Sequence, residues 1–206
     1  MKTHTRLRAL FIGTVLIFAN SYWMMNASIF GAGYPTTVSL FYNVIFILFL
    51  LTSANLLVQK YLPKVALNRA ELLIVYAMLC ISSAVGGLDM LQVLIPLIGG
   101  VFRLATPENE WESLFAKYIP DWIAVKDKEI LRAYDLGEST LYTAEHFKAW
   151  LTPILVWSAF IFVLLFVMVC INSVLRRQWI ENEKLSYPII QLPSELTKSN
   201  FFDKKL

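Results

Sequence analysis

Four long stretches of this chain carry almost no charged side chains, and this pattern limits its fold more than any other feature. They cover residues 7–25, 38–57, 71–102 and 151–175. About 20 apolar residues in a helix span the ~30 Å hydrocarbon core of a bilayer. Charged residues make up 16% of the chain, below the roughly 25% typical of soluble domains. We therefore predict an all-α integral membrane protein with about four transmembrane helices.

The first apolar run, residues 7–25, follows a basic start, which is also typical of a cleaved signal peptide. Tyr22 and Trp23 stand near its end, where a membrane helix has interfacial aromatic anchors and a signal peptide has small residues. The run is therefore interpreted as a membrane helix, with a signal peptide as the alternative.

The third run, residues 71–102, is longer than one crossing needs, because thirty helical residues extend over ~45 Å. Two serines, the pair Gly86-Gly87 and the carboxylate of Asp89 interrupt its middle. Pro96 and the pair Gly99-Gly100 add further weak points. The pattern predicts either a tilted, broken helix or two short segments.

Residues 103–148 form a polar segment with 9 acidic and 6 basic side chains, in which we predict short amphipathic helices. Thr106 and Pro107 are suited to start the first helix, and Pro120 to end it. Its apolar stripe consists of Trp111, Leu114, Phe115, Tyr118 and Ile119. The stripe lies either along the membrane interface or against the rest of the protein.

Two further helix boundaries are predicted around this segment. A second short helix is expected over residues 127–134, closing at Gly137. Thr143 is a suitable N-cap for the approach to the fourth membrane helix, residues 149–175.

Basic residues predict the orientation, because lysine and arginine are in excess on the cytoplasmic side of membrane proteins. Residues 1–8 and 58–70 each hold three basic and no acidic side chains, and residues 176–206 hold 6 basic against 4 acidic. The segment 103–148 is net −3. If residues 71–102 cross the membrane once, the three basic segments fall on one side of the membrane and the acidic segment 103–148 falls on the other. We predict a multi-pass protein of the cell (inner) membrane, with cytoplasmic N- and C-termini and segment 103–148 outside.

Asp89 is an acidic residue deep within an apolar run. A charge at membrane depth is costly, so it indicates a cation site, a proton relay or a water-filled cavity. Gln92, three residues on, would share its helical face. The alternative is that the break at Gly86-Gly87 lies near the outer surface and that Asp89 caps the next segment.

The break itself is a second functional candidate. Interrupted membrane helices expose backbone groups, which are tolerated only within protein or along a cavity. Transporters bind ions and substrates at such breaks. The alternative is a structural helix kinked at glycine for packing.

Polar side chains on the apolar helices are a third candidate. Asn20, Asn43 and Asn55 are expected to form interhelical hydrogen bonds. Asn20, close to the two aromatic anchors, alternatively lines a polar cavity. The candidates for a substrate or ion pathway are Asp89, Gln92, Gly86, Gly87, Asn20, Tyr22 and Trp23.

Motifs of catalysis, metal binding and nucleotide binding are missing from the sequence. It contains no GxGxxG, Walker A, HExxH or CxxC pattern. Cys80 and Cys170 lie within apolar runs. His4 and His146 lie outside these runs and far apart in the sequence, and both are interpreted as surface residues. We therefore expect no enzyme, no metal, no cofactor and no nucleic-acid partner.

The segment after the fourth run carries a family-like element, the letters KLSYP leading into LPSEL. It resembles the cytoplasmic segment of oligopeptide-transporter-like membrane proteins, where a Leu-x-Phe/Tyr-Pro element follows a helix. The opening run, with Asn20 to Trp23, is similar to the first helix of that group. The likeness is to a bacterial branch catalogued only as a domain of unknown function. The matching residues are Arg177, Glu183, Leu185, Tyr187 and Pro188.

This resemblance implies a protein with a dozen or more helices, of which the chain is the N-terminal portion, and transport of peptides or metal chelates. Transporter-like function is therefore the leading hypothesis. The alternative is a non-catalytic subunit of a larger membrane complex. Besides the lipid bilayer, the expected partners are other membrane subunits, a homo-oligomer or the missing C-terminal remainder.

Overall fold

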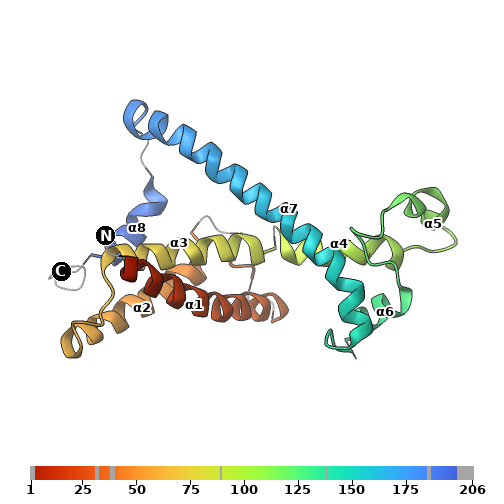
Figure 1. Ribbon diagram of the computed structural model, residues 1–206, viewed down its shortest axis with the longest axis horizontal. Helices are drawn as coiled ribbons and strands as arrows, with labels where there is room; N and C mark the ends of the chain where they lie inside the picture. The colour runs from red at the N-terminus through yellow and green to blue at the C-terminus, as the bar shows by residue number, and fades with distance from the viewer. Residues whose placement is uncertain are drawn as a thin grey trace. The chain divides into compact units, whose positions relative to one another are not determined.

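A computed structural model of the chain describes residues 3–30, 33–37, 40–88, 90–137, 139–184 and 187–198. Every regular element in these residues is a helix, as predicted (Figure 1). The elements are α1 (Thr3–Ile29), α2 (Tyr42–Tyr61), α3 (Arg69–Gly86), α4 (Leu91–Arg103), α5 (Trp111–Leu114), the 3-10 helix η1 (Ala116–Tyr118), α6 (Lys128–Leu136), α7 (Ala144–Arg177), the π-helix η2 (Gln178–Asn182) and α8 (Pro188–Leu196).

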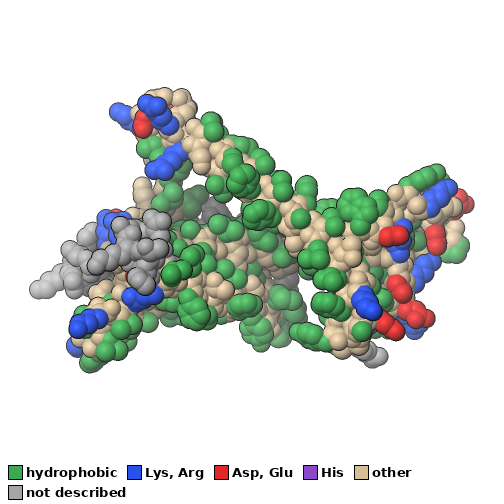
Figure 2. Space-filling view, in the orientation of Figure 1, with side chains coloured by type: hydrophobic (Ala, Val, Ile, Leu, Met, Phe, Trp, Pro, Cys, Tyr) green, Lys and Arg blue, Asp and Glu red, His purple; other side chains and the backbone are tan. Residues whose placement is uncertain are grey.

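Four helical stretches in the described part of the chain are long and apolar enough to cross a membrane, which confirms the predicted class of protein. They are Leu7–Ala27, Tyr42–Tyr61, Arg69–Arg103 and Ala144–Asn182. Their outer surfaces are apolar: Phe11 on α1 is 72% exposed and Phe162 on α7 is 70% exposed. Figure 2 shows hydrophobic side chains along α1 and α7, and acidic side chains gathered near α5 and α6. Lipid is the natural solvent for such helices.

The chain forms two compact units, and the first comprises Met1–Gln92 with Ser186–Leu206. In this unit α1 and α3 lie side by side (Figure 1). Their contact, with α2, encloses a fully buried apolar cluster of Ala9, Val44, Val75 and Leu79. The flexible end of the Met78 side chain on α3 occupies the space that a Cβ at Gly13 of α1 would take.

Asn55 anchors the connection between α2 and α3. Its amide donates to the Leu67 carbonyl over 2.9 Å, and its Oδ1 accepts from the Leu67 amide over 2.7 Å. The predicted interhelical bond of Asn55 is therefore made to the loop before α3 instead. The next residue, Asn68, caps α3 in a reciprocal capping box with Glu71. These bonds fix where α3 enters the unit.

The third apolar run is broken where the sequence predicts it. Helix α3 ends at Gly86, and the next helix, α4, begins at Leu91. The Gly87 carbonyl accepts hydrogen bonds from the amides of Met90 and Gln92, each over 3.3 Å. Residue 89 lies outside the described residues.

The two other predicted weak points of this run are wrong. Helix α4 continues through Pro96 and through Gly99-Gly100 to Arg103. Gly99 serves close packing, because a Cβ there would overlap Cδ2 of Leu131 on α6. From the sequence alone, a glycine that makes room for a neighbouring side chain cannot be distinguished from a glycine that breaks a helix.

The second unit, Val93–Leu185, has a core of its own. The buried residues are Ile98, Phe102, Ala116, Val125, Leu131 and Trp150. Two hydrogen bonds join separate segments around it, from the Val125 amide to the Ile98 carbonyl over 3.1 Å and from Trp157 Nε1 to the Ile123 carbonyl over 2.9 Å. Arg103 and Asp135 form an ion pair of 2.7 Å that joins α4 to α6.

The predicted helix carrying the Trp111 stripe is wrong in its length and its cap. Helix α5 has only four residues and follows Glu110, which has a left-handed φ of 52°. The side chain of Asn109 accepts from the amides of Thr106 and Trp111, so a side-chain turn replaces the first helical turn. The later part of the stripe falls in the separate 3-10 helix η1 and beyond it, so the stripe does not form one continuous helical face. In the same turn, a hydrogen bond from the Thr106 hydroxyl lowers the pKa of Glu108.

The later boundaries agree with the sequence more closely. Asp127 caps α6, and Gly137 ends it in the left-handed conformation. Helix α7 begins after Thr143 as predicted, although the Thr143 hydroxyl makes no capping bond. His146, predicted as a surface residue, is partly buried and its Nδ1 lies 2.9 Å from the Thr140 carbonyl oxygen.

Helix α8 was not predicted. The sequence after α7 is polar and contains Pro188 and Pro193, and it is interpreted from the sequence only as a cytoplasmic tail. In the structure Pro188 opens α8, where proline is tolerated. Helix α8 contacts α2 and α3 in the first unit, where Arg69 donates to the Ser194 hydroxyl over 2.8 Å.

Candidate functional site

Three polar side chains from three helices meet inside the first unit. Asn20 lies on α1, Asn43 on α2 and Ser83 on α3, and each is 0% exposed. Asn20 Nδ2 donates to Ser83 Oγ over 2.9 Å. Asn43 Nδ2 donates to Asn20 Oδ1 over 2.7 Å and to Ser83 Oγ over 3.0 Å. We call these three residues the polar cluster.

The cluster confirms the predicted interhelical hydrogen bonds of Asn20 and Asn43. Helices bury such groups in apolar surroundings only when partners satisfy them. Here each of the three helices α1, α2 and α3 supplies one partner, so the cluster fixes how they pack together.

Two oxygen acceptors near the cluster lack partners. Asn43 Oδ1 and Thr36 Oγ1 are buried and have no hydrogen-bond partner among the described residues. An unpaired buried acceptor costs about 1–3 kcal/mol. A buried polar atom that its own protein leaves unpaired is a natural position for a donor from outside the chain, such as a ligand, an ion or a water molecule.

The interruption of the third run adjoins the cluster. Gly87 follows Ser83 by one helical turn, and a Cβ at Gly87 would lie 2.7 Å from Thr36 Oγ1 and 2.8 Å from the Ser83 carbonyl oxygen. At Gly86 a Cβ would lie 2.9 Å from Met24 Cε on α1. The two glycines therefore let Met24 and Thr36 approach the end of α3 closely. Both features that the sequence singled out, Asn20 and the glycine pair, thus belong to one region.

The aromatic anchors of α1 do not belong to the cluster. Trp23 packs edge-on against Phe46 and Tyr42 of α2, with ring centroids 5.5 Å and 6.4 Å apart. Tyr22 is 72% exposed. Neither residue hydrogen-bonds to the cluster in the contacts described above, and their part in a pathway stays a prediction. An outward Tyr22 is consistent with an anchor in a membrane interface.

The remaining pathway candidates are only partly placed. The Gln92 backbone amide joins the turn after α3 through its bond to Gly87. Asp89 lies outside the described residues, so the helical face that it is expected to share with Gln92 stays a prediction. Among the described residues, no group of three or more His, Cys, Asp or Glu side chains is placed to hold a metal ion.

The family-like element is divided in the structure. Arg177 ends α7 and pairs with Glu181 over 3.0 Å, and Glu183 accepts from the Gln178 side chain over 3.2 Å. Tyr187 precedes α8 and Pro188 begins it, whereas Leu185 lies outside the described residues. The element therefore connects the end of α7 to α8.

Sequence reasoning missed the roles of Ser83 and Thr36. Ser83 is one of the two serines that interrupt the third apolar run, and Thr36 lies between the first and second apolar runs, where the sequence carries no charge. The signal that could have found Ser83 is its position three residues before Gly86, on the helix expected to break.

Comparison with known proteins places this chain in a family. The sequence profile of a family described as "Family of unknown function (DUF6785)" matches residues 1–206, and the chain belongs to this family. The expected membership in a family of unknown function is thereby confirmed, but this match does not link the family to oligopeptide transporters. No curated protein and no solved structure matches the chain.

Proposed function

We propose that this protein is transporter-like, and that the polar cluster beside the interrupted third segment forms part of a path or site for a small polar solute or a coupling ion. The observation that carries the proposal is the unpaired, fully buried Asn43 Oδ1. The amide of the same side chain donates to Ser83, which lies one turn before the break after Gly86. Membrane transporters bind ions and substrates where a spanning helix is interrupted near buried polar groups.

The resemblance of the Tyr187-Pro188 element to oligopeptide-transporter-like proteins suggests the substrate class, short peptides or metal chelates. Asp89, two residues after Gly87 in the sequence, is the proposed proton or cation carrier. The proposed orientation puts both termini in the cytoplasm and residues 103–148 outside, because basic residues favour the cytoplasmic side.

Uptake into vesicles tests this proposal. The protein encoded by the complete natural reading frame is reconstituted into liposomes, and entry of a labelled tripeptide is followed under an imposed proton gradient. We expect gradient-driven uptake by the natural protein. Asp89→Asn should reduce it to the level of protein-free vesicles, because an amide cannot carry the proton.

The matched control is Glu110→Gln, which neutralises an exposed carboxylate in the polar segment and should leave uptake unchanged. Full uptake by a folded Asp89→Asn protein would remove this residue from the mechanism. Failure to take up either peptides or metal chelates, together with stoichiometric co-purification of other membrane proteins in mild detergent, would favour the complex subunit instead.

A further inference from the structure

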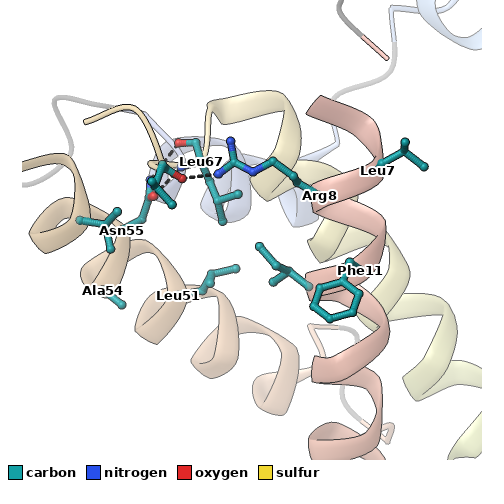
Figure 3. Close-up of a pocket in the computed structure, with 10 residues that line it drawn as sticks. Leu7, Arg8, Phe11, Leu51, Ala54, Asn55 and Leu67 are labelled. Atoms are coloured by element: carbon teal, nitrogen blue, oxygen red, sulfur yellow. Dashed lines mark hydrogen bonds between the residues drawn. The ribbon is translucent and has the colours of Figure 1, made fainter. Parts of the chain in front are cut away.

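A separate pocket of about 530 Å³ opens in the first unit, away from the polar cluster. It lies between the first turns of α1 and the last turns of α2, and the segment before α3 closes one side (Figure 3). Phe11 on α1 and Leu51 and Ala54 on α2 supply an apolar lining. Figure 3 shows Phe11 and Leu51 between the two helices. Such a lining favours a hydrocarbon occupant.

One charged side chain stands at this apolar pocket. Arg8 extends from α1 toward the segment near Leu67 (Figure 3), and its Nη2 donates to the Val65 carbonyl. Arg8 is exposed. Of the described residues that line the pocket, Arg8 alone has a charged side chain. A guanidinium carries five N–H donors, so one bond to a carbonyl leaves capacity for a bidentate pair with a phosphate.

The position of Arg8 along α1 matches the depth of a lipid headgroup. Arg8 is the second residue of the candidate span Leu7–Ala27, and the pocket continues from it along the apolar part of that span. An apolar cavity that begins at a cation, at the end of a membrane helix, matches a phospholipid, whose charged headgroup adjoins its hydrocarbon chains.

Charge complementarity selects an anionic lipid. The segment that contributes Val58 and Val65 to the pocket also carries Lys60 and Lys64, and residues 58–70 contain no acidic side chain. Clusters of basic residues at a membrane edge attract anionic lipids. A zwitterionic headgroup would place its own cation near these lysines.

We propose that this pocket binds an anionic phospholipid of the bilayer, with one acyl chain between α1 and α2 and the phosphate paired with Arg8. The site is independent of the polar cluster and of the proposed transport function. Because the lipid contacts α1, α2 and the α2–α3 connection together, its binding would stabilise the packing of the first unit.

Native mass spectrometry of the full chain in detergent tests the proposal. The protein is titrated with phosphatidylglycerol or with phosphatidylcholine carrying the same acyl chains. We expect tighter binding of phosphatidylglycerol. Arg8→Gln should weaken that binding by about fivefold, the value of one basic residue near a membrane surface.

Two further variants separate the headgroup from the acyl chain. Ala54→Phe fills the pocket, so it should weaken binding of both lipids. Arg176→Gln, which removes an exposed arginine at the end of α7, should change neither. Thermal unfolding of each variant confirms that it is folded. Equal affinity for the two lipids, or equal losses from Arg8→Gln and Arg176→Gln, would overturn the proposal.

Discussion

Replacing Trp150 by alanine is expected to lower the free energy of unfolding by about 3–5 kcal/mol, the range for truncating a buried aromatic side chain. Trp150 is 7% exposed and stands in the core of the second unit with Phe102 and Leu131. Its ring also packs against Tyr134, with centroids 5.6 Å apart. Alanine would remove these contacts and leave a cavity that helices α4, α6 and α7 cannot close without moving.

Titration with a denaturing detergent, followed by circular dichroism, measures this loss. Trp122→Ala is the matched control, because Trp122 belongs to the same unit but is 54% exposed. The control should change the unfolding free energy by no more than about 0.5 kcal/mol. If the two variants unfold alike, the core of the second unit is not packed as described.

Replacing Asn43 by leucine should cost about 1–2 kcal/mol, in the upper part of the range for interhelical hydrogen bonds in membranes. Leucine has the same branched side-chain skeleton as asparagine, although it is bulkier, and it removes the donor to Asn20 Oδ1 and one donor to Ser83 Oγ. All three side chains are fully buried in this structure, so the substitution leaves Asn20 Oδ1 without its buried partner.

Asn172→Leu provides the control for this change. Asn172 also lies on an apolar helix, but its amide donates to the Met168 carbonyl of its own helix and the residue is exposed. Leucine at this position should be neutral or slightly stabilising. A double variant with Asn20→Leu should cost less than the sum of the single variants, because both remove the same bond. Additive costs would mean that the two asparagines do not interact.

Much of the fold could be predicted from the sequence, because a bilayer imposes simple rules on length and polarity. The apolar runs, the break at Gly86-Gly87 and the boundaries of α6 follow from local composition and capping residues. The interpretation of Asn20 and Asn43 followed from the cost of burying an amide among apolar residues.

The features that could not be predicted depend on tertiary contacts. Ser83 joins the cluster only because three helices cross in a particular register, and a serine on an apolar helix can also bond to its own backbone. Gly99 resembles a helix breaker until Leu131 is seen against it. The short α5 depends on the side chain of Asn109, which competes with the helix for backbone amides.

Thiol labelling at residue 83 tests most directly whether the polar cluster belongs to a water-filled path. Cys80 and Cys170 are first replaced by alanine, and Ser83→Cys is then exposed to a membrane-impermeant thiol reagent in intact cells. Such reagents require a thiolate, which forms only where water reaches the sulfur. Leu79→Cys is the control, one turn earlier on α3 within the buried apolar cluster.

A transporter opens its site to water in turn on each side of the membrane, although the cluster is closed in this structure. We therefore expect Ser83→Cys to be modified over time while Leu79→Cys stays unmodified. If both stay unmodified while the exposed Thr140→Cys reacts, the cluster only holds the three helices together, and the proposed path is wrong.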